Sequence, residues 1–424
     1  MKGPSGFFPA LGQADPNAKY LVVAEGLLNW GGGFFLVARP IYLYAIGLNP
    51  TTVGALISLQ AFLAVVLSIP IAMLSDALGR KRFVVYGMLL DGAGAFLFFY
   101  SSDIVALVAA QVLFAVVNAA AGAPFLALFT GTTTKDNRNE LFVLLGFFGL
   151  ASLSVGAYAS GLPVPLESLL KVGYLDGFRF LFLVVSITSL AGGVIVALFV
   201  SETRERPPEG RRLTLERMVK LPKRSMSVVK KFSVIGFTGF GAGLVIPLLS
   251  LWFTLRFDVT TLVVGPLFGT IFLITAFASL LTPALARRRG SVFTIVVTQL
   301  SAIVLLVSIP LSPDYLSAGA LMVARSTLAN MAGPITNSFT MGLIHPDERA
   351  TASSIIQLFD SVPRAYAPTL GGYLISLGLI NLPFFITAVL YLASSSLFYF
   401  LFRNVRAPDF EAAGAASGEP SPLP

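Results

Sequence analysis

Charged side chains are scarce in this chain, and six of them fall inside long apolar stretches. Only 12% of the 424 residues are Asp, Glu, Lys or Arg, whereas 55% are hydrophobic. In hydrocarbon an ionisable side chain costs at least about 2.5 kcal/mol, so each one needs a partner, water or a task. A carboxylate in such a position can carry a proton, and a guanidinium group can bind an anion. The six residues are Glu25, Arg39, Asp91, Arg325, Asp360 and Arg364.

Glu25 and Arg39 share the first apolar stretch, and each has two interpretations. Glu25 either faces a water-accessible cavity, where it takes up and releases a proton, or lies near enough to the helix end to be solvated. Arg39 follows 14 residues later, which is about 21 Å of helix, so the two side chains cannot pair. Arg39 therefore either binds an anionic group or pairs with a carboxylate from another helix.

Each of the remaining charges has a structural and a functional interpretation. Asp360 and Arg364 are four residues apart, so they share a helix face and we expect an ion pair, which could also pass on a proton. Asp91 is predicted to brace neighbouring helices, with proton coupling as its alternative. Arg325 either faces a substrate or caps helix carbonyls.

Neutral polar and aromatic side chains on the same stretches are candidates for the wall of a substrate cavity. The polar side chains suit hydrogen bonding to a substrate, although hydrogen bonding between helices is at least as common, and the aromatic side chains suit an apolar wall. Gln111 and Asn118 are seven residues apart and therefore share one helix face. The full set of neutral candidates is Asn29, Trp30, Phe34, Gln111, Asn118 and Asn330.

The elements that position these residues are predicted to be membrane-spanning helices. The mean hydropathy of +0.82 is too high for a water-soluble protein. Apolar stretches of about 20 to 28 residues can each cross a hydrocarbon layer of about 30 Å as a helix. Such stretches lack the alternation of barrel strands, so the predicted fold is all-α. There are twelve of them: 19–45, 51–74, 83–101, 103–130, 140–162, 177–200, 232–255, 260–285, 291–311, 315–343, 350–377 and 381–403.

The distribution of basic residues predicts the orientation in the membrane. Lys and Arg gather in the tails and in alternate loops, including Arg80 to Arg82 and the segment 201–231. By the positive-inside rule both termini are expected in the cytoplasm, and the chain in the cell membrane. The predicted parts are a tail at 1–18, a six-helix bundle at 19–200, a basic linker at 201–231, a second bundle at 232–405 and a disordered tail at 406–424.

The two predicted bundles carry matching segments in the same order, at a shift of 207 to 211 residues. GGFFLVARPIYLY in the first stretch matches FGAGLVIPLLSLW in the seventh, with Pro40 aligned to Pro247. LGRKRF, residues 78–83, matches LARRRGSVF, residues 285–293. Matches of this kind indicate a duplicated six-helix unit. A repeat with a pocket at its interface is the architecture of alternating-access transporters.

The segment LSDALGRKR, residues 74–82, resembles the signature of the major facilitator superfamily between helices 2 and 3. Asp76, Gly79, Arg80 and Lys81 match it, whereas Ala77 departs from the expected basic residue, and Ala72 replaces a glycine. The resemblance implies that helices 1, 4, 7 and 10 line the cavity. It also implies that Asp76 holds the cytoplasmic side shut in the outward-open state, by hydrogen bonding near residues 350–353.

Other classes of protein fit the sequence poorly. The chain has no cysteine and one histidine, and it lacks a GxxxxGK[ST] loop and an HExxH motif. We therefore expect no enzyme activity, no cofactor, no metal site and no nucleic-acid partner, and we expect a monomer whose partners are a small-molecule substrate, protons and the bilayer. The favoured hypothesis is proton-coupled secondary transport, with export of hydrophobic or cationic compounds ahead of uptake or facilitated diffusion of a sugar or organic anion. A non-transporting sensor or scaffold on the same fold is the alternative from another class.

Overall fold

The computed structural model describes residues 14–134, 137–202, 225–285, 291–345 and 348–403, and within these ranges every regular element is a helix. The first half of the chain forms the helices α2 (Pro16–Ala45), α3 (Pro50–Leu78), α4 (Arg80–Tyr100), α5 (Ile104–Ala121), α6 (Ala123–Thr130), α7 (Arg138–Ala159), α8 (Pro163–Leu170) and α9 (Tyr174–Phe199). The second half forms α11 (Met226–Lys231), η1 (Phe232–Val234), α12 (Ile235–Val245), η2 (Ile246–Leu248), α13 (Leu249–Phe257), α14 (Thr261–Leu285), α15 (Ser291–Ser308), η3 (Ile309–Leu311), α16 (Tyr315–Gly342), α17 (Arg349–Ser376) and α18 (Leu382–Phe402).

The predicted all-α architecture of twelve spans is confirmed. In the described part of the chain, nine helical segments are long and apolar enough to cross a membrane. Two of these segments combine consecutive elements, α5 with α6 and α11 through α13. The helices α16, α17 and α15 with η3 account for the other three predicted stretches.

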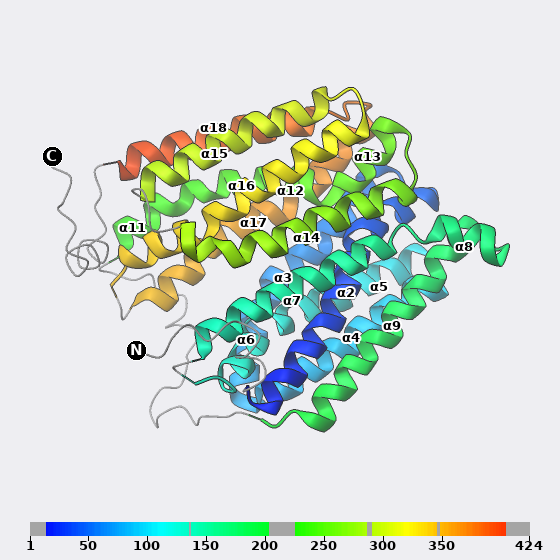
Figure 1. Cartoon of the computed structure of the whole chain (residues 1–424), viewed down its shortest axis with the longest axis horizontal. Helices are drawn as coiled ribbons and strands as arrows, with labels where there is room; N and C mark the ends of the chain where they lie inside the picture. Colours follow the sequence, from blue (N-terminus) through cyan, green and yellow to red (C-terminus); the bar gives the residue numbers. More distant parts are fainter. Residues whose placement is uncertain (1–13, 135–136, 203–224, 286–290, 346–347, 404–424) are drawn as a thin grey trace.

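The helices form two bundles that lie side by side (Figure 1). In this view the first half, coloured blue to green, lies below the second half, coloured green to red, and α3, α7, α14 and α17 lie between them. The start of α2 and the end of α18 lie on the left, which we name the termini side. The short helix α8 lies on the opposite side, which we name the α8 side.

Helix starts follow local capping chemistry. The Asp15, Asn49 and Asp103 side chains accept hydrogen bonds from backbone N–H groups in the first turns of α2, α3 and α5. Such caps satisfy donors that have no partner inside the helix. Pro16 and Pro50 follow two of these caps, at the position where a missing N–H costs nothing.

The seventh span departs from the prediction in two ways. It begins at Met226, six residues before the predicted start at 232, because Val229 and Phe232 are buried against Phe398 and Phe402 of the second bundle. Its helix is also interrupted at η2, which contains Pro247. Proline cannot donate the helical hydrogen bond, so the span breaks into α12 and α13 there.

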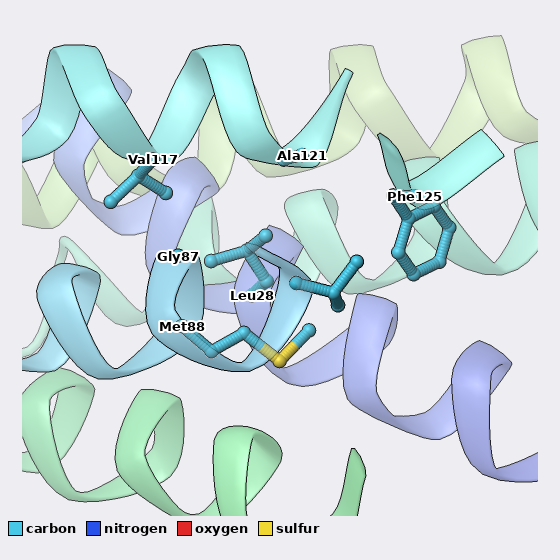
Figure 2. A pocket seen from close by; sticks show the side chains of 7 residues that line it. Leu28, Gly87, Met88, Val117, Ala121 and Phe125 are labelled. Atoms are coloured by element: carbon cyan, nitrogen blue, oxygen red, sulfur yellow. The ribbon is translucent and has the colours of Figure 1, made fainter. Parts of the chain in front are cut away.

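A small cavity inside the first bundle is a packing gap and not a substrate site. Figure 2 shows its lining, which is entirely apolar. Its volume of about 10 Å³ is no larger than the space that one water molecule requires. The lining residues come from α2, α4, α5 and α6: Leu28, Val84, Gly87, Met88, Val117, Ala121 and Phe125.

Candidate functional site

The two bundles meet on the α8 side through direct backbone contact between α3 and α17. A Cβ atom placed on Gly54 would lie 2.1 Å from the Pro368 carbonyl oxygen, and one on Gly372 would lie 2.1 Å from the Pro50 carbonyl oxygen. No side chain fits at either position, so glycine is required for this approach. The α3 and α17 helices therefore close the interface at this end.

Hydrogen bonds between uncharged groups reinforce this closure. Those between α3 and α17 join Thr51 Oγ1 to Ser376 Oγ at 3.0 Å and the Thr369 N–H to Ser58 Oγ at 3.0 Å. Those between α7 and α14 join Ser154 Oγ to the Gly269 carbonyl at 2.7 Å and the Tyr158 hydroxyl to Thr270 Oγ1 at 2.8 Å. Both pairs of helices connect the first bundle to the second, so the α8 side of the structure is shut.

Arg39 lies on α2, six residues before the helix ends on the α8 side. Its Nη1 donates to the side-chain oxygens of Gln60 on α3 and Gln111 on α5, the latter at 3.1 Å. No ion pair joins Arg39 to a carboxylate in the part of the chain that the structure describes. Of the two interpretations of Arg39, pairing with a carboxylate is therefore not seen among the described residues.

The groups around Arg39 leave two donors without acceptors. Nε of Arg39 and Nε2 of Gln111 are both buried, and neither has a hydrogen-bond partner. Gln111 is completely buried, whereas Arg39 keeps part of its surface exposed. Gln60 was not among the predicted site residues, and its one signal in the sequence is an amide within an otherwise apolar stretch.

Glu25 lies nine residues into α2, and its side chain is hydrogen-bonded to Asn29 of the same helix. Asn29 Nδ2 donates to Glu25 Oε1 and to the Glu25 carbonyl, each at 2.9 Å. The second carboxylate oxygen, Oε2, is buried without a partner. A Cβ atom on Gly26 would lie 3.1 Å from Ser152 Oγ, so this segment of α2 packs against α7.

Asp91 on α4 accepts a hydrogen bond from Ser189 Oγ of α9 at 2.7 Å. A Cβ atom on Gly31 of α2 would lie 4.0 Å from Asp91 Oδ2. The carboxylate therefore sits where three helices of the first bundle meet, which agrees with the bracing role that the sequence favoured.

Asp360 and Arg364 form the ion pair that their spacing predicted. Arg364 Nε and Nη2 donate to the carboxylate through three contacts of 2.8 to 3.0 Å. The Arg364 side chain keeps 42% of its surface exposed and Asp360 keeps 23%. The charge of each residue is thus neutralised within α17.

Arg325 on α16 is 5% exposed and lies inside the second bundle. Its guanidinium carbon lies 5.9 Å from the centre of the Tyr391 ring on α18. Its Nε is buried without a partner, and among the described residues it has no ion pair. The side chain of Asn330, on the same helix, lies outside the described part of the structure.

The aromatic cavity wall that the sequence suggested is not formed by Phe34. Phe34 is completely buried and packs edge-on against Phe182, with ring centres 5.3 Å apart. It belongs to an aromatic core of the first bundle, in which residues of α2 pack against residues of α9. Trp30 is partly buried against the same core, and Asn118 is exposed although its heptad neighbour Gln111 is buried.

The turn between α3 and α4 holds the signature residues on the termini side. Asp76 and Arg80 form an ion pair at 3.0 Å, and Arg80 Nη1 also donates to the Ala127 carbonyl on α6 at 3.4 Å. Lys81 Nζ donates to the Ala197 carbonyl at the end of α9 at 2.8 Å. These contacts tie the turn to its own bundle.

Glu202 also contacts this turn, although the sequence did not single it out. Its Oε2 accepts from the Lys81 backbone N–H at 3.0 Å. Gly79 has a φ of +107°, and a Cβ atom there would lie 2.8 Å from Glu202 Oε2. The sequence signal is an acidic residue directly after the sixth span, in the segment SETRER.

Comparisons with known proteins place this geometry in context. The model of the Major Facilitator Superfamily matches residues 21–368. An uncharacterized membrane protein of Saccharomyces cerevisiae, YJR124C, is 23% identical over 406 residues, covering 87% of this chain and 90% of its relative.

Solved structures share the fold at low sequence identity. A bacterial homologue of the human lysosomal transporter Spinster, in an inward-facing and occupied conformation, has a TM-score of 0.71 at 16% identity, covering 92% of this chain and 98% of the other. A POT family transporter in complex with 5-aminolevulinic acid has a TM-score of 0.72 at 15% identity, covering 95% and 98%.

Proposed function

Because the chain belongs to the major facilitator superfamily, it is a membrane transporter, and we propose that it moves a small molecule by alternating access with protons as the coupling ion. The closed α8 side is one of the two end states of such a cycle. Opening it requires that α3 separate from α17 and α7 from α14. The basic residues of the termini side support a cytoplasmic location for that side in the cell membrane.

The environment of Glu25 carries the proposal of proton coupling. One oxygen of its carboxylate is buried without a donor, and the described residues offer it no cation. Asp360, in contrast, is neutralised by Arg364, and Asp91 is held by Ser189 within one bundle. Protonation would relieve the unpaired charge on Glu25. Because Glu25 lies beside α7, which contacts the other bundle, its protonation can influence the closure.

The substitution Glu25→Gln tests this role. Purified protein in liposomes with an imposed pH gradient is expected to lose gradient-driven flux when Glu25 becomes an amide that cannot titrate. Exchange of substrate across the same membrane should persist, because exchange does not require net proton movement. A luminal pH dye follows the protons, and a panel of small anions, sugars and organic cations supplies the substrate.

Glu167→Gln is the matched control, since Glu167 is exposed on α8. It should leave gradient-driven flux unchanged. Full gradient-driven flux in Glu25→Gln would remove Glu25 from the coupling mechanism. The absence of any compound-dependent flux in the native protein would favour a sensor or scaffold on this fold.

The substrate and the gate complete the proposal. The sequence favoured hydrophobic or cationic compounds, but the surroundings of Arg39 support the alternative of an organic anion. We also propose that Asp76 changes partner during the cycle, from Arg80 to the start of α17, when the termini side closes. The transporter is proposed to work as a monomer.

A further inference from the structure

Arg39 is a cation inside the membrane whose contacts are all with neutral groups. The side-chain oxygens of Gln60 and Gln111 receive its Nη1 hydrogens, and an amide oxygen carries no net charge to balance a guanidinium group. A charge buried without a counter-ion is strongly destabilising. Among the described residues, no carboxylate pairs with this guanidinium group.

The two other carboxylates inside the apolar stretches of the first bundle do not supply a counter-ion. Glu25 lies 14 residues before Arg39 on the same helix, which is a distance of about 21 Å. Asp91 lies beside Gly31, which is about 12 Å along the helix from Arg39. Neither of these two carboxylates reaches the guanidinium group, so its charge is left available for an anionic group of a ligand.

The free donors of Arg39 have the geometry that an oxyanion requires. Nη1 is occupied by the two glutamines, whereas Nε is buried without a partner, and Nη2 makes no hydrogen bond among the described residues. Nε and Nη2 form one edge of the guanidinium plane, and such an edge binds two oxygens of a carboxylate or phosphate side by side.

Gln111 adds a second donor that points to the same conclusion. It is completely buried, its oxygen is fixed by Arg39 Nη1, and its Nε2 has no acceptor. The two side chains that carry these unmet donors come from different helices, α2 and α5, and are joined by the hydrogen bond from Arg39 Nη1 to Gln111 Oε1. An acceptor-only group with negative charge satisfies both, whereas a cation or a hydrocarbon satisfies neither.

We propose that Arg39 and Gln111 form a subsite for an oxyanion group, a carboxylate or a phosphate, of the transported substrate. This inference rests on the proposed transport function, because it assigns the substrate class of that transporter. Gln60 positions the guanidinium group through Nη1 and leaves the donors of the Nε and Nη2 edge without a hydrogen-bond partner among the described residues.

Binding to the purified protein tests the subsite without any transport assay. Acetate, succinate and inorganic phosphate are titrated at constant ionic strength, with glucose and choline as neutral and cationic controls, and the melting temperature and calorimetric heat are followed. At least one oxyanion should raise the melting temperature of the native protein. Acetate and phosphate distinguish a carboxylate from a phosphate ligand.

Four variants locate the binding. Arg39→Gln should abolish it, and Arg39→Lys, which keeps the charge but loses the two-donor edge, should weaken it by about tenfold. Gln111→Glu places a carboxylate beside Arg39 and should abolish binding while Arg39 remains in place and the protein stays folded. Arg179→Gln is the matched control, because Arg179 already pairs with Asp176 at the α8 side.

The outcomes separate the subsite from the proposed transport. If no oxyanion binds the native protein, or if Gln111→Glu binds as tightly as the native protein, the subsite does not exist. If Arg39→Gln transports a neutral or cationic compound at the native rate, transport stands and the subsite falls. If oxyanions bind in the expected pattern but none drives flux in liposomes, the subsite stands and the proposed transport falls.

Discussion

Glu202 stabilises the turn between α3 and α4 by accepting a hydrogen bond at the start of α4. Its carboxylate receives the Lys81 N–H, which has no acceptor within the first turn of the helix. A negative charge at this position also interacts favourably with the helix dipole. Gly79 has two roles here, since its φ of +107° forms the turn and its missing side chain leaves room for the carboxylate.

Replacement of Glu202 should therefore lower the stability of the first bundle. Glu202→Ala removes the acceptor for Lys81, and loss of a helix cap typically costs about 0.5–2 kcal/mol. We expect a lower melting temperature for the purified protein in detergent, measured by its intrinsic fluorescence. Glu167→Ala, at an exposed position on α8, should not change it. Equal shifts in the two variants would show that Glu202 does not hold the turn.

At the scale of single residues, the sequence predicted contacts within one helix better than contacts between helices. The pair Asp360 and Arg364 was predictable because both residues lie on one helix, where spacing determines contact. The contact between Arg39 and Gln60 joins two helices, and no spacing rule relates positions on different helices. For the same reason Phe34, predicted as cavity wall, turned out to be core.

The closure at the α8 side depends on how closely the helices α3 and α17 approach. Gly54→Val should push the helices apart, because a Cβ atom alone would already lie 2.1 Å from a backbone oxygen of α17. The equilibrium should shift away from the closed α8 side. Ser58→Cys, in a chain without native cysteine, reports this as faster thiol labelling, since Ser58 is 7% exposed in the closed state.

Gly146→Val is the control for this experiment. Gly146 lies in the helix α7, and a Cβ atom there would meet nothing within 4 Å. Labelling of Ser58→Cys should be unchanged in that background. Equally fast labelling with both glycine variants would mean that Gly54 does not control the closure.

At the scale of elements, the spans were predictable because hydrocarbon requires long apolar helices with internally satisfied backbones. The exceptions are two helix starts that depend on single residues. The eight-residue helix α8 is too short for periodicity to identify, and Pro163 starts it. The seventh span extends back to Met226 through the buried Val229, which composition alone assigned to the linker.

At the scale of the whole molecule, a covalent link between the two bundles on the α8 side should abolish transport. Thr51 and Ser376 lie on opposite bundles with their hydroxyl oxygens 3.0 Å apart. Thr51→Cys combined with Ser376→Cys places two thiols within reach of a disulfide bond. Oxidation should abolish flux, and a reducing agent should restore it. Each single cysteine variant should transport normally under both conditions, and flux in the oxidised double variant would contradict the role of this closure.

The duplication seen in the sequence predicted two bundles. It could not predict which side of the interface is shut, because that depends on contacts between residues more than 300 positions apart, such as Ser58 and Thr369. Both conformations of such a protein satisfy the same apolar pattern, so composition and periodicity do not distinguish them.

The two sides of the molecule differ in how they respond to dissolved ions. The contacts that shut the α8 side join hydroxyls, backbone groups and glycines, none of which carries a charge. The turn on the termini side contains the ion pair of Asp76 and Arg80, whose attraction weakens as ionic strength rises. Because we propose that Asp76 exchanges Arg80 for the start of α17 when the termini side closes, salt added on the termini side of the membrane should shift the conformational balance, whereas the same salt on the α8 side should leave it nearly unchanged.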